Sequence, residues 1–367
     1  VSLGDKWKIS KWSGSLQLQS ESLVPQNAAM DVQTYMQTQV AAQRERTKEA
    51  EQLLAFGNNA FLNIYALIKL TPPFAAFHEA TRFLPLALVI FGVFVGLAAL
   101  LFLLASGLTL VILTAGLDLS VGANVAMSAC LAATVMKATG SIALAVFAGL
   151  GCGLLIGIAN GLLITLIRIP PFIATYGMLW ILHGITYWFM KGETIHGFPA
   201  AFRAVGSGYW LGIPIPVYLM VVFLLIGVVF AQRTRWGQEI YAVGANPEAA
   251  HLSGVPVKRR LVLVYAVSGA MAGLASLIFL ARLNSAEGDI GESLTLPAIA
   301  AVLIGGTSLF GGVGSVFGTL VGALILTLVL NGMNLLAINA SWQPVVTGVI
   351  VVMSVFLDNL THKGDRQ

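Results

Sequence analysis

A stretch of 85 residues, from Phe83 to Ile167, contains only two charged side chains, Asp118 and Lys137. A water-soluble domain has charged side chains at about a quarter of its positions, so this stretch cannot form a water-exposed surface. In the whole chain, 57% of the residues are apolar and 10% are charged. The sequence therefore excludes a soluble enzyme and a disulfide-held secreted module. It predicts an all-α protein that crosses a lipid bilayer several times.

Long apolar runs follow one another through most of the chain, where a bilayer core needs about 20 apolar residues per helix. The first run, Phe83–Leu117, is too long for one such helix and short for two. Eight further runs follow, and the shortest indicate broken or re-entrant helices shielded by their neighbours. The eight are Val121–Met136, Ile142–Ile167, Phe172–Met190, Ile213–Ala231, Leu261–Ala281, Ala298–Phe310, Val316–Ile338 and Val345–Leu357. We predict about 8–10 transmembrane helices within residues 83–360, after a polar, poorly defined region 1–82.

The distribution of basic residues predicts the orientation, because lysine and arginine near the ends of spans favour the cytoplasmic side. The connection 232–260 contains five basic residues and two acidic ones, whereas Arg282–Glu292 contains three acidic residues and one basic residue. We therefore place the connection 232–260 and the tail 361–367 in the cytoplasm. Arg282–Glu292 and the loop Lys191–Gly212 are then expected outside.

A short helix is predicted inside the cytoplasmic connection 232–260. Asn246 is a favoured N-cap residue, and Pro247 suits the first helical position. Glu248 interacts favourably with the positive end of the helix dipole, and Gly254 is typical of a helix stop. Two interpretations remain open for such a helix, which is far too short to cross a bilayer. It is either a simple surface turn or a docking element that seats in a groove of a partner protein.

Asp118 is the only carboxylate between Glu79 and Glu193. An ionised carboxylate in the middle of a bilayer costs roughly 2.5–3.5 kcal/mol, so Asp118 must be shielded, capped or near the interface. Either Asp118 or Ser120 is a plausible N-cap for the next span. A direct role in a gate or a substrate path and a role in proton relay also stay open.

The segment Gly305–Gly314 is a glycine-rich break between two apolar runs. It does not resemble a phosphate-binding loop, because no Gly-Lys-Ser/Thr follows and its context is hydrophobic. Thr307 and Ser308 are suited to satisfy backbone groups that such a break leaves free. The break predicts either a tight turn between helices or a discontinuous helix that lines a path.

Several motifs resemble those of one transporter family. Glu248-Ala249-Ala250, followed after three residues by Gly254, resembles the coupling-loop motif of ATP-binding-cassette (ABC) importer permeases. The blocks Val111–Gly122 and Ala300–Gly312 resemble the ribose/xylose/arabinose-type monosaccharide permeases. Smaller blocks fit the same pattern, namely Asn160-Gly161, Ile169–Ile173, Gly212–Val217 and Asn331–Leu336. The match is collinear from about Gly96 to Asn359, and it departs from the family at Thr295-Leu296-Pro297, where an acidic-Leu-acidic sequence is usual.

The resemblance implies the transmembrane permease subunit of an ABC importer in a bacterial inner membrane, with a cytoplasmic C-terminus. It implies that a periplasmic binding protein delivers a monosaccharide and that separate cytoplasmic ATPase subunits bind ATP. This chain would then be no enzyme, would need no cofactor, catalytic residue or metal site, and would bind no nucleic acid. Two permeases would associate, as a homodimer or a pseudo-symmetric heterodimer. The residues expected to couple to the ATPase are Glu248, Ala249, Ala250 and Gly254.

Polar side chains within or beside the spans are the candidates for a translocation path or gate. Amides both donate and accept hydrogen bonds, as sugar hydroxyls require, but they also join helices to one another. The candidates are Asp118, Ser120, Asn124, Asn160, Thr307, Ser308 and Asn331, with Asn334 and Gln343 as further neutral polar groups. The alternatives are a permease for branched-chain amino acids or nucleosides, and an ion-coupled secondary transporter. The latter predicts partnered charges within the membrane, of which the chain has almost none.

Overall fold

The computed structural model describes residues 84–362, with side chains from residue 94 onward except for a few near the C-terminus. Contacts divide the chain into two units, Val1–Ala87 and Leu88–Gln367. The predicted polar region 1–82 and residues 363–367 lie outside the described residues. Each of the eight apolar runs after the first overlaps one helix: α4 (Val121–Thr139), α5 (Ile142–Thr165), α6 (Pro171–Met190), α8 (Ile215–Arg233), α11 (Val257–Leu283), α12 (Glu292–Ile304), α13 (Val316–Leu335) and α14 (Trp342–His362). The prediction of an all-α polytopic membrane protein is confirmed.

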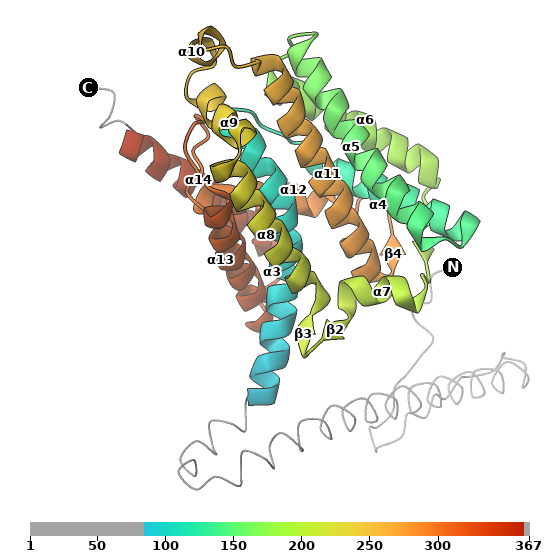
Figure 1. The fold of residues 1–367 in the computed structure, drawn as a ribbon. Helices are drawn as coiled ribbons and strands as arrows, with labels where there is room; N and C mark the ends of the chain where they lie inside the picture. Colours follow the sequence, from blue (N-terminus) through green and yellow to red (C-terminus); the bar gives the residue numbers. More distant parts are fainter. Residues whose placement is uncertain (1–83, 363–367) are drawn as a thin grey trace, which may run out of the picture. The chain divides into compact units, whose positions relative to one another are not determined.

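The first apolar run, Phe83–Leu117, forms one helix, α3 (Leu84–Leu113), at the centre of the described helices (Figure 1). Its side chains from Phe94 onward are almost all buried against other helices. The helix ends at Leu113 because Ala115 adopts a positive φ of 57°, a left-handed conformation that a helix cannot continue through. The segment that follows, residues 114–120, contains the buried residues Asp118 and Ser120 and thus lies within the bundle.

Glycines allow α5 and α11 to pack with their backbones in contact. Along α5 they recur at every fourth residue, so they share one face of the helix. A Cβ atom added to Gly157 would overlap the carbonyl oxygen of Tyr265, and one added to Gly269 would overlap that of Gly153. Such close approach is typical of small residues between membrane helices.

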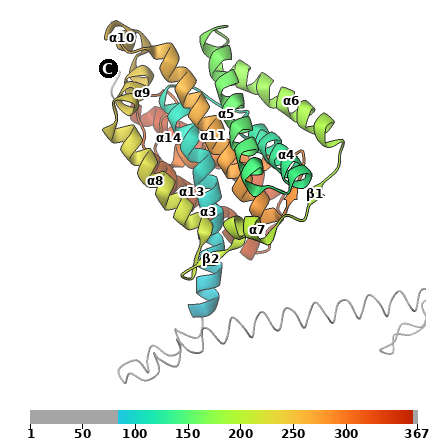
Figure 2. The same ribbon diagram turned by 45° about the vertical axis from the view of Figure 1, so that its right-hand side comes forward.

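Two ends of the bundle are distinct in both views (Figures 1 and 2). One end holds α9 (Arg235–Ala245) and α10 (Pro247–Leu252). The other holds α7 (Ala200–Ser207) and two short antiparallel ribbons, in which β1 (Ile195–His196) pairs with β4 (Ser285–Ala286) and β2 (Tyr209–Trp210) pairs with β3 (Ile213–Pro214). The connection predicted as the loop Lys191–Gly212 therefore contains a helix, which contacts α11 closely at Gly206. The connection predicted to be cytoplasmic thus lies at one end and the loops predicted to be external lie at the other, while the orientation itself stays a prediction.

Six of the described helices are long and apolar enough to cross a membrane, while α12 is a shorter apolar helix. The predicted run Ala298–Phe310 is misplaced, because α12 begins at Glu292 and ends at Ile304. Gly305 ends the helix, and the next residues turn the chain into α13. α12 and α13 pack antiparallel, with Gly322 against Ala301 and Gly318 against Gly305. This packing shields the short helix α12 from lipid. The shortest apolar runs predict such shielding by neighbouring helices.

Candidate coupling site and buried polar core

Two capped helices form the surface at the α9–α10 end. Thr234 caps α9, since its Oγ1 accepts a hydrogen bond from Gly237 N at 3.1 Å. Asn246 caps α10, and its Oδ1 accepts from Glu248 N at 3.0 Å and from Ala249 N at 2.9 Å. Gly254 follows α10 with a φ of 82°. The predicted capped helix after Asn246 is confirmed, whereas α9 was missed by the sequence analysis.

The residues predicted to couple to an ATPase do not share one environment. Glu248 and Ala249 are exposed on α10, while Ala250 is only 5% exposed and faces the protein. Leu252, which the sequence analysis did not select, is 83% exposed. Leu252 presents an apolar side chain to the surface at the end of a capped helix. Such a side chain is suited to bind in an apolar groove of a partner protein.

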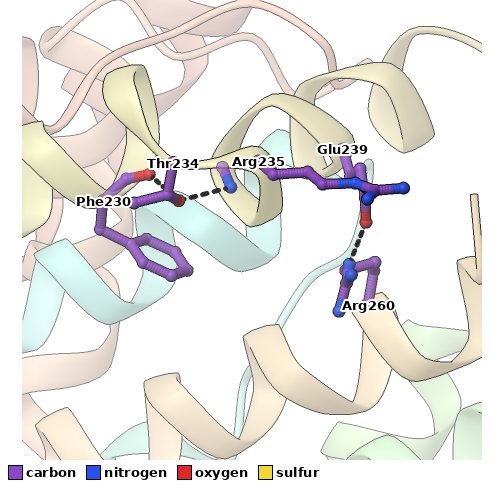
Figure 3. Close-up of polar contacts among 6 residues, drawn as sticks. Phe230, Thr234, Arg235, Glu239 and Arg260 are labelled. Atoms are coloured by element: carbon purple, nitrogen blue, oxygen red, sulfur yellow. Dashed lines mark hydrogen bonds and ion pairs between the residues drawn. The ribbon is translucent and has the colours of Figure 1, made fainter.

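Glu239 of α9 is held between two arginines (Figure 3). Its Oε2 accepts a short hydrogen bond from Arg260 Nε of α11, and its Oε1 accepts from Arg235 Nε at 2.8 Å. The hydrogen bond from Arg260 is the main cause that lowers the pKa of the Glu239 carboxyl, with Arg235 adding to it. Thr234 also donates to Phe230 O at 2.6 Å in the same view. Together these contacts fix α9 to α8 and α11.

We predict that Glu239→Gln lowers the free energy of unfolding of the permease by about 1–3 kcal/mol, because the nearly buried Arg260 loses its charged partner. Arg235→Gln is the matched control and should change little, since the Arg235 side chain is 86% exposed. Thermal unfolding in detergent measures both. Because the pKa of Glu239 is lowered by folding, the stabilisation is complete above its unfolded-state pKa and is lost as pH falls through the folded-state pKa. Equal stability of Glu239→Gln and Arg235→Gln would contradict a stabilising contact between Glu239 and Arg260.

α9 also lies directly against the glycine-rich segment Gly305–Gly314. Tyr241 Oη donates to Gly314 O at 2.8 Å. A Cβ atom added to Gly244 would overlap Leu113 O and approach Gly312 N to 2.5 Å. The same Gly312 N donates to Leu113 O at 2.9 Å. Thus α9, the end of α3 and the glycine-rich segment meet through their backbones.

The glycine-rich segment forms the turn between α12 and α13, which is one of the two forms that the sequence predicted. Thr307 and Ser308 are 2% and 1% exposed within it. Ser308 Oγ donates to Asp358 Oδ2 of α14 at 2.8 Å. Thr307 Oγ1 has no hydrogen-bond partner among the described residues. The turn therefore links α12, α13 and α14 near α9.

Asp118, Ser120 and Asn160 come together in a buried polar core beyond the end of α3. Asp118 Oδ1 accepts from Ser120 N at 3.0 Å and Ser120 Oγ at 2.7 Å, and its Oδ2 accepts from Ser268 Oγ at 3.2 Å. Asn160 Nδ2 donates to Ser120 Oγ at 2.8 Å, which leaves Asn160 Oδ1 without a partner among the described residues. Asn124 lies nearby in α4 and donates to Gly153 O at 3.2 Å. The core joins α4, α5 and α11.

The prediction that Asp118 or Ser120 caps α4 is wrong. Ser120 is the residue before α4, but it has a helical φ of −79°, and its side chain makes no capping hydrogen bond. Its hydroxyl donates to Asp118 instead. A buried carboxylate takes such donors because each partly replaces lost hydration. Shielding of Asp118 by hydrogen bonds is therefore observed, while its role in a gate or path stays a prediction.

Asn331, the remaining candidate, lies apart from the polar core. It is on the second half of α13, where it lines a cavity together with Asn334 and Gln343. The predicted residues thus fall into three places: the α10 surface, the core beyond α3 with the adjoining glycine-rich turn, and this cavity. Among the described residues, no three His, Cys, Asp or Glu side chains lie close enough together to hold a metal ion.

Comparison with known proteins identifies relatives along most of the chain. The family described as "Branched-chain amino acid transport system / permease component" matches residues 89–355. The ribose import permease of Bacillus subtilis (strain 168) is 43% identical over 258 residues, covering 70% of this chain and 80% of the relative. The galactose/methyl galactoside import permease of Salmonella typhimurium is 35% identical over 279 residues, covering 71% and 83%. The fructose import permease of Rhizobium meliloti is 35% identical over 303 residues, covering 76% and 84%. No solved structure gives a significant match.

Proposed function

Since the chain belongs to this family of import permeases, we propose that it is the transmembrane subunit of an ABC importer and forms the path of a monosaccharide. The identity to the ribose, galactose and fructose import permeases carries this proposal. The description of the family names branched-chain amino acids, but these relatives over most of the chain all import sugars. In this proposal the chain supplies a path and a docking surface, and a separate ATPase subunit supplies the hydrolysis of ATP.

In this proposal, cytoplasmic ATPase subunits dock on α10. The capped geometry of α10, its exposed Leu252 and the five basic residues of the connection 232–260 support this placement. Closure of the ATPase subunits on ATP then moves α10 and α9, which share the capping residue Asn246. Because α9 contacts the glycine-rich turn and the end of α3, its movement reaches α3, α12 and α14.

The other partners follow from the same arrangement. A binding protein on the external side delivers the sugar near α7 and the short ribbons. Two permeases form the complete path, as a homodimer or a pseudo-symmetric heterodimer. The protein lies in the plasma membrane of a bacterium. Its C-terminus and α10 both face the cytoplasm. Basic residues beside the spans support this orientation.

Reconstituted transport tests the proposal. The permease is reconstituted into proteoliposomes with ATP and an ATPase subunit of a sugar importer inside, and with a sugar-binding protein outside. We expect ATP-dependent accumulation of radiolabelled ribose, galactose or fructose, and only when all three proteins are present. Accumulation of labelled leucine, with no accumulation of any of the three sugars, would show that the chain is a permease for branched-chain amino acids. Sugar accumulation without the ATPase or without ATP would contradict the proposal entirely.

A further inference from the structure

A cavity of about 490 Å³ lies between α3, α12, α13 and α14. It is formed by the beginning of α12, the second half of α13 and the beginning of α14. The opposite ends of these three helices adjoin the glycine-rich turn beside α9. The cavity therefore lies in the half of the bundle away from α10, on the side from which a binding protein would deliver cargo. Its volume is within the range of about 300–1,000 Å³ typical of small-molecule sites.

Amide groups gather on the α13–α14 side of the cavity. Gln343 Nε2 donates to Asn334 Oδ1 at 2.7 Å, which leaves the Gln343 oxygen and the Asn334 nitrogen free to bind a ligand. Asn331, one helical turn before Asn334, lines the same cavity, and its side chain makes no hydrogen bond to another residue that the structure describes. Three adjacent amides thus offer both donors and acceptors, as a polyhydroxy compound requires.

One carboxylate also lines the cavity, together with the hydroxyl groups of Ser293, Thr327 and Thr347. Glu292, the first residue of α12, lines the cavity, and its Oε1 lies 2.6 Å from His183 Nδ1 of α6. The second carboxylate oxygen remains to accept from a hydroxyl group. The rest of the wall is mainly apolar, with leucines of α3 and Pro297 and Pro344. Apolar walls with a few placed polar groups are usual for ligand sites, and the C–H faces of a sugar ring suit them.

The lining also discriminates between classes of cargo. An amino acid carries a carboxylate as well as an ammonium group, and a site for it needs a partner for each charge. Glu292 is suited to the ammonium group, but the lining residues that belong to the described part of the chain include no lysine, arginine or histidine to pair with the carboxylate. A neutral polyol leaves no such charge unpaired. The cavity therefore favours a sugar over an amino acid.

We propose that this cavity is a subsite where a monosaccharide rests on its way through the permease, bound by Asn331, Asn334 and Gln343. The proposal rests on the proposed function and names the place of its cargo. The site is loose, because amides and one carboxylate supply few strong contacts. Such a site suits a cargo that must leave again towards the opposite side.

Transport by variants gives the first test. In the reconstituted system, Asn331→Ala and Gln343→Ala are each expected to reduce sugar uptake about tenfold at low sugar concentration, as for the loss of one hydrogen bond to a ligand. Stimulation of the ATPase by the loaded binding protein should persist, since α10 is unchanged. Asn339→Ala is the control, because Asn339 lies on the turn between α13 and α14 outside the cavity. Wild-type uptake by both cavity variants would overturn the subsite and leave the proposed function intact.

Protection from labelling gives a second test that needs neither ATPase nor binding protein. Ala340 lines the cavity and is exposed, so an Ala340→Cys variant of the purified permease should react with a maleimide. We expect ribose, galactose or fructose to slow this reaction and leucine to leave it unchanged. The wild-type chain measures any reaction of its own cysteines, Cys130 and Cys152. Protection by leucine alone, or by no compound, would overturn the subsite even if sugar uptake is observed.

Discussion

Leu252→Asp is expected to reduce ATP-driven uptake by at least about a hundredfold while the permease still folds. The leucine side chain is 83% exposed at the end of α10, so no internal packing is lost. In the complex, burial of a leucine contributes about 1.5–3 kcal/mol, and an unpaired carboxylate in the same groove costs more. The sum corresponds to at least about two powers of ten in affinity. Uptake into proteoliposomes and co-purification of the ATPase measure the effect.

The control for this variant is Leu211→Asp. Leu211 is equally exposed, at 80%, but it lies between β2 and β3 at the other end of the bundle. Its φ of 50° is one that aspartate tolerates better than leucine, so folding should not suffer. We expect normal association with the ATPase. If Leu252→Asp transports at the wild-type rate, α10 is not the docking element.

Gly244→Ala is expected to destabilise the permease by about 3 kcal/mol or more, although it adds only one methyl group. That methyl group would overlap Leu113 O, where α9, the end of α3 and Gly312 meet. Overpacking between side chains costs about 1–3 kcal/mol, and backbone atoms have less freedom to move away. This contact joins the docking surface to the bundle. The fraction of the Gly244→Ala permease that folds should therefore also show weaker stimulation of the ATPase. Thermal unfolding in detergent and ATPase stimulation measure both consequences.

Gly332→Ala provides a matched comparison within another helix, α13. A Cβ atom added at Gly332 meets nothing within 4 Å. Alanine is the better helix former by about 1 kcal/mol, so this variant should be as stable as the wild type or more stable. A Gly244→Ala permease that unfolds at the same temperature as Gly332→Ala would show that α9 is not packed as described.

The helices that hydrophobicity specifies were predictable from the sequence. Runs such as Val121–Met136 and Val316–Ile338 became helices with the same first residue, α4 and α13. The cap at Asn246 was equally predictable, because side-chain capping is a local interaction within three residues. The resemblance to the coupling-loop motif of ABC importer permeases fell on the same segment, from Glu248 to Gly254, and its role in coupling stays a prediction.

Features that depend on contacts between distant residues were not predictable. Glu239 of α9 and Arg260 of α11 are separated in the sequence by α10, and their spacing along the chain does not indicate that they pair. The exposure of Leu252 and the burial of Ala250 follow from how α10 packs on its neighbours. Only a Thr at position 234, a favoured N-cap residue, signalled the start of α9. Likewise, serine is a favoured N-cap residue, but the Ser120 hydroxyl donates its hydrogen bond to the buried carboxyl group of Asp118 and not to the helix.

Site-directed cross-linking tests whether α10 is the surface on which the ATPase docks. Cys130 and Cys152 are first replaced by alanine. A single cysteine is then introduced, as Leu252→Cys in one variant and Leu211→Cys in the other, and each variant is treated with a bifunctional reagent in vesicles that carry the ATPase. We predict that Leu252→Cys becomes cross-linked to the ATPase subunit and that Leu211→Cys does not. A cross-link to the ATPase from Leu211→Cys alone would place the docking surface at the opposite end of the bundle and contradict docking on α10.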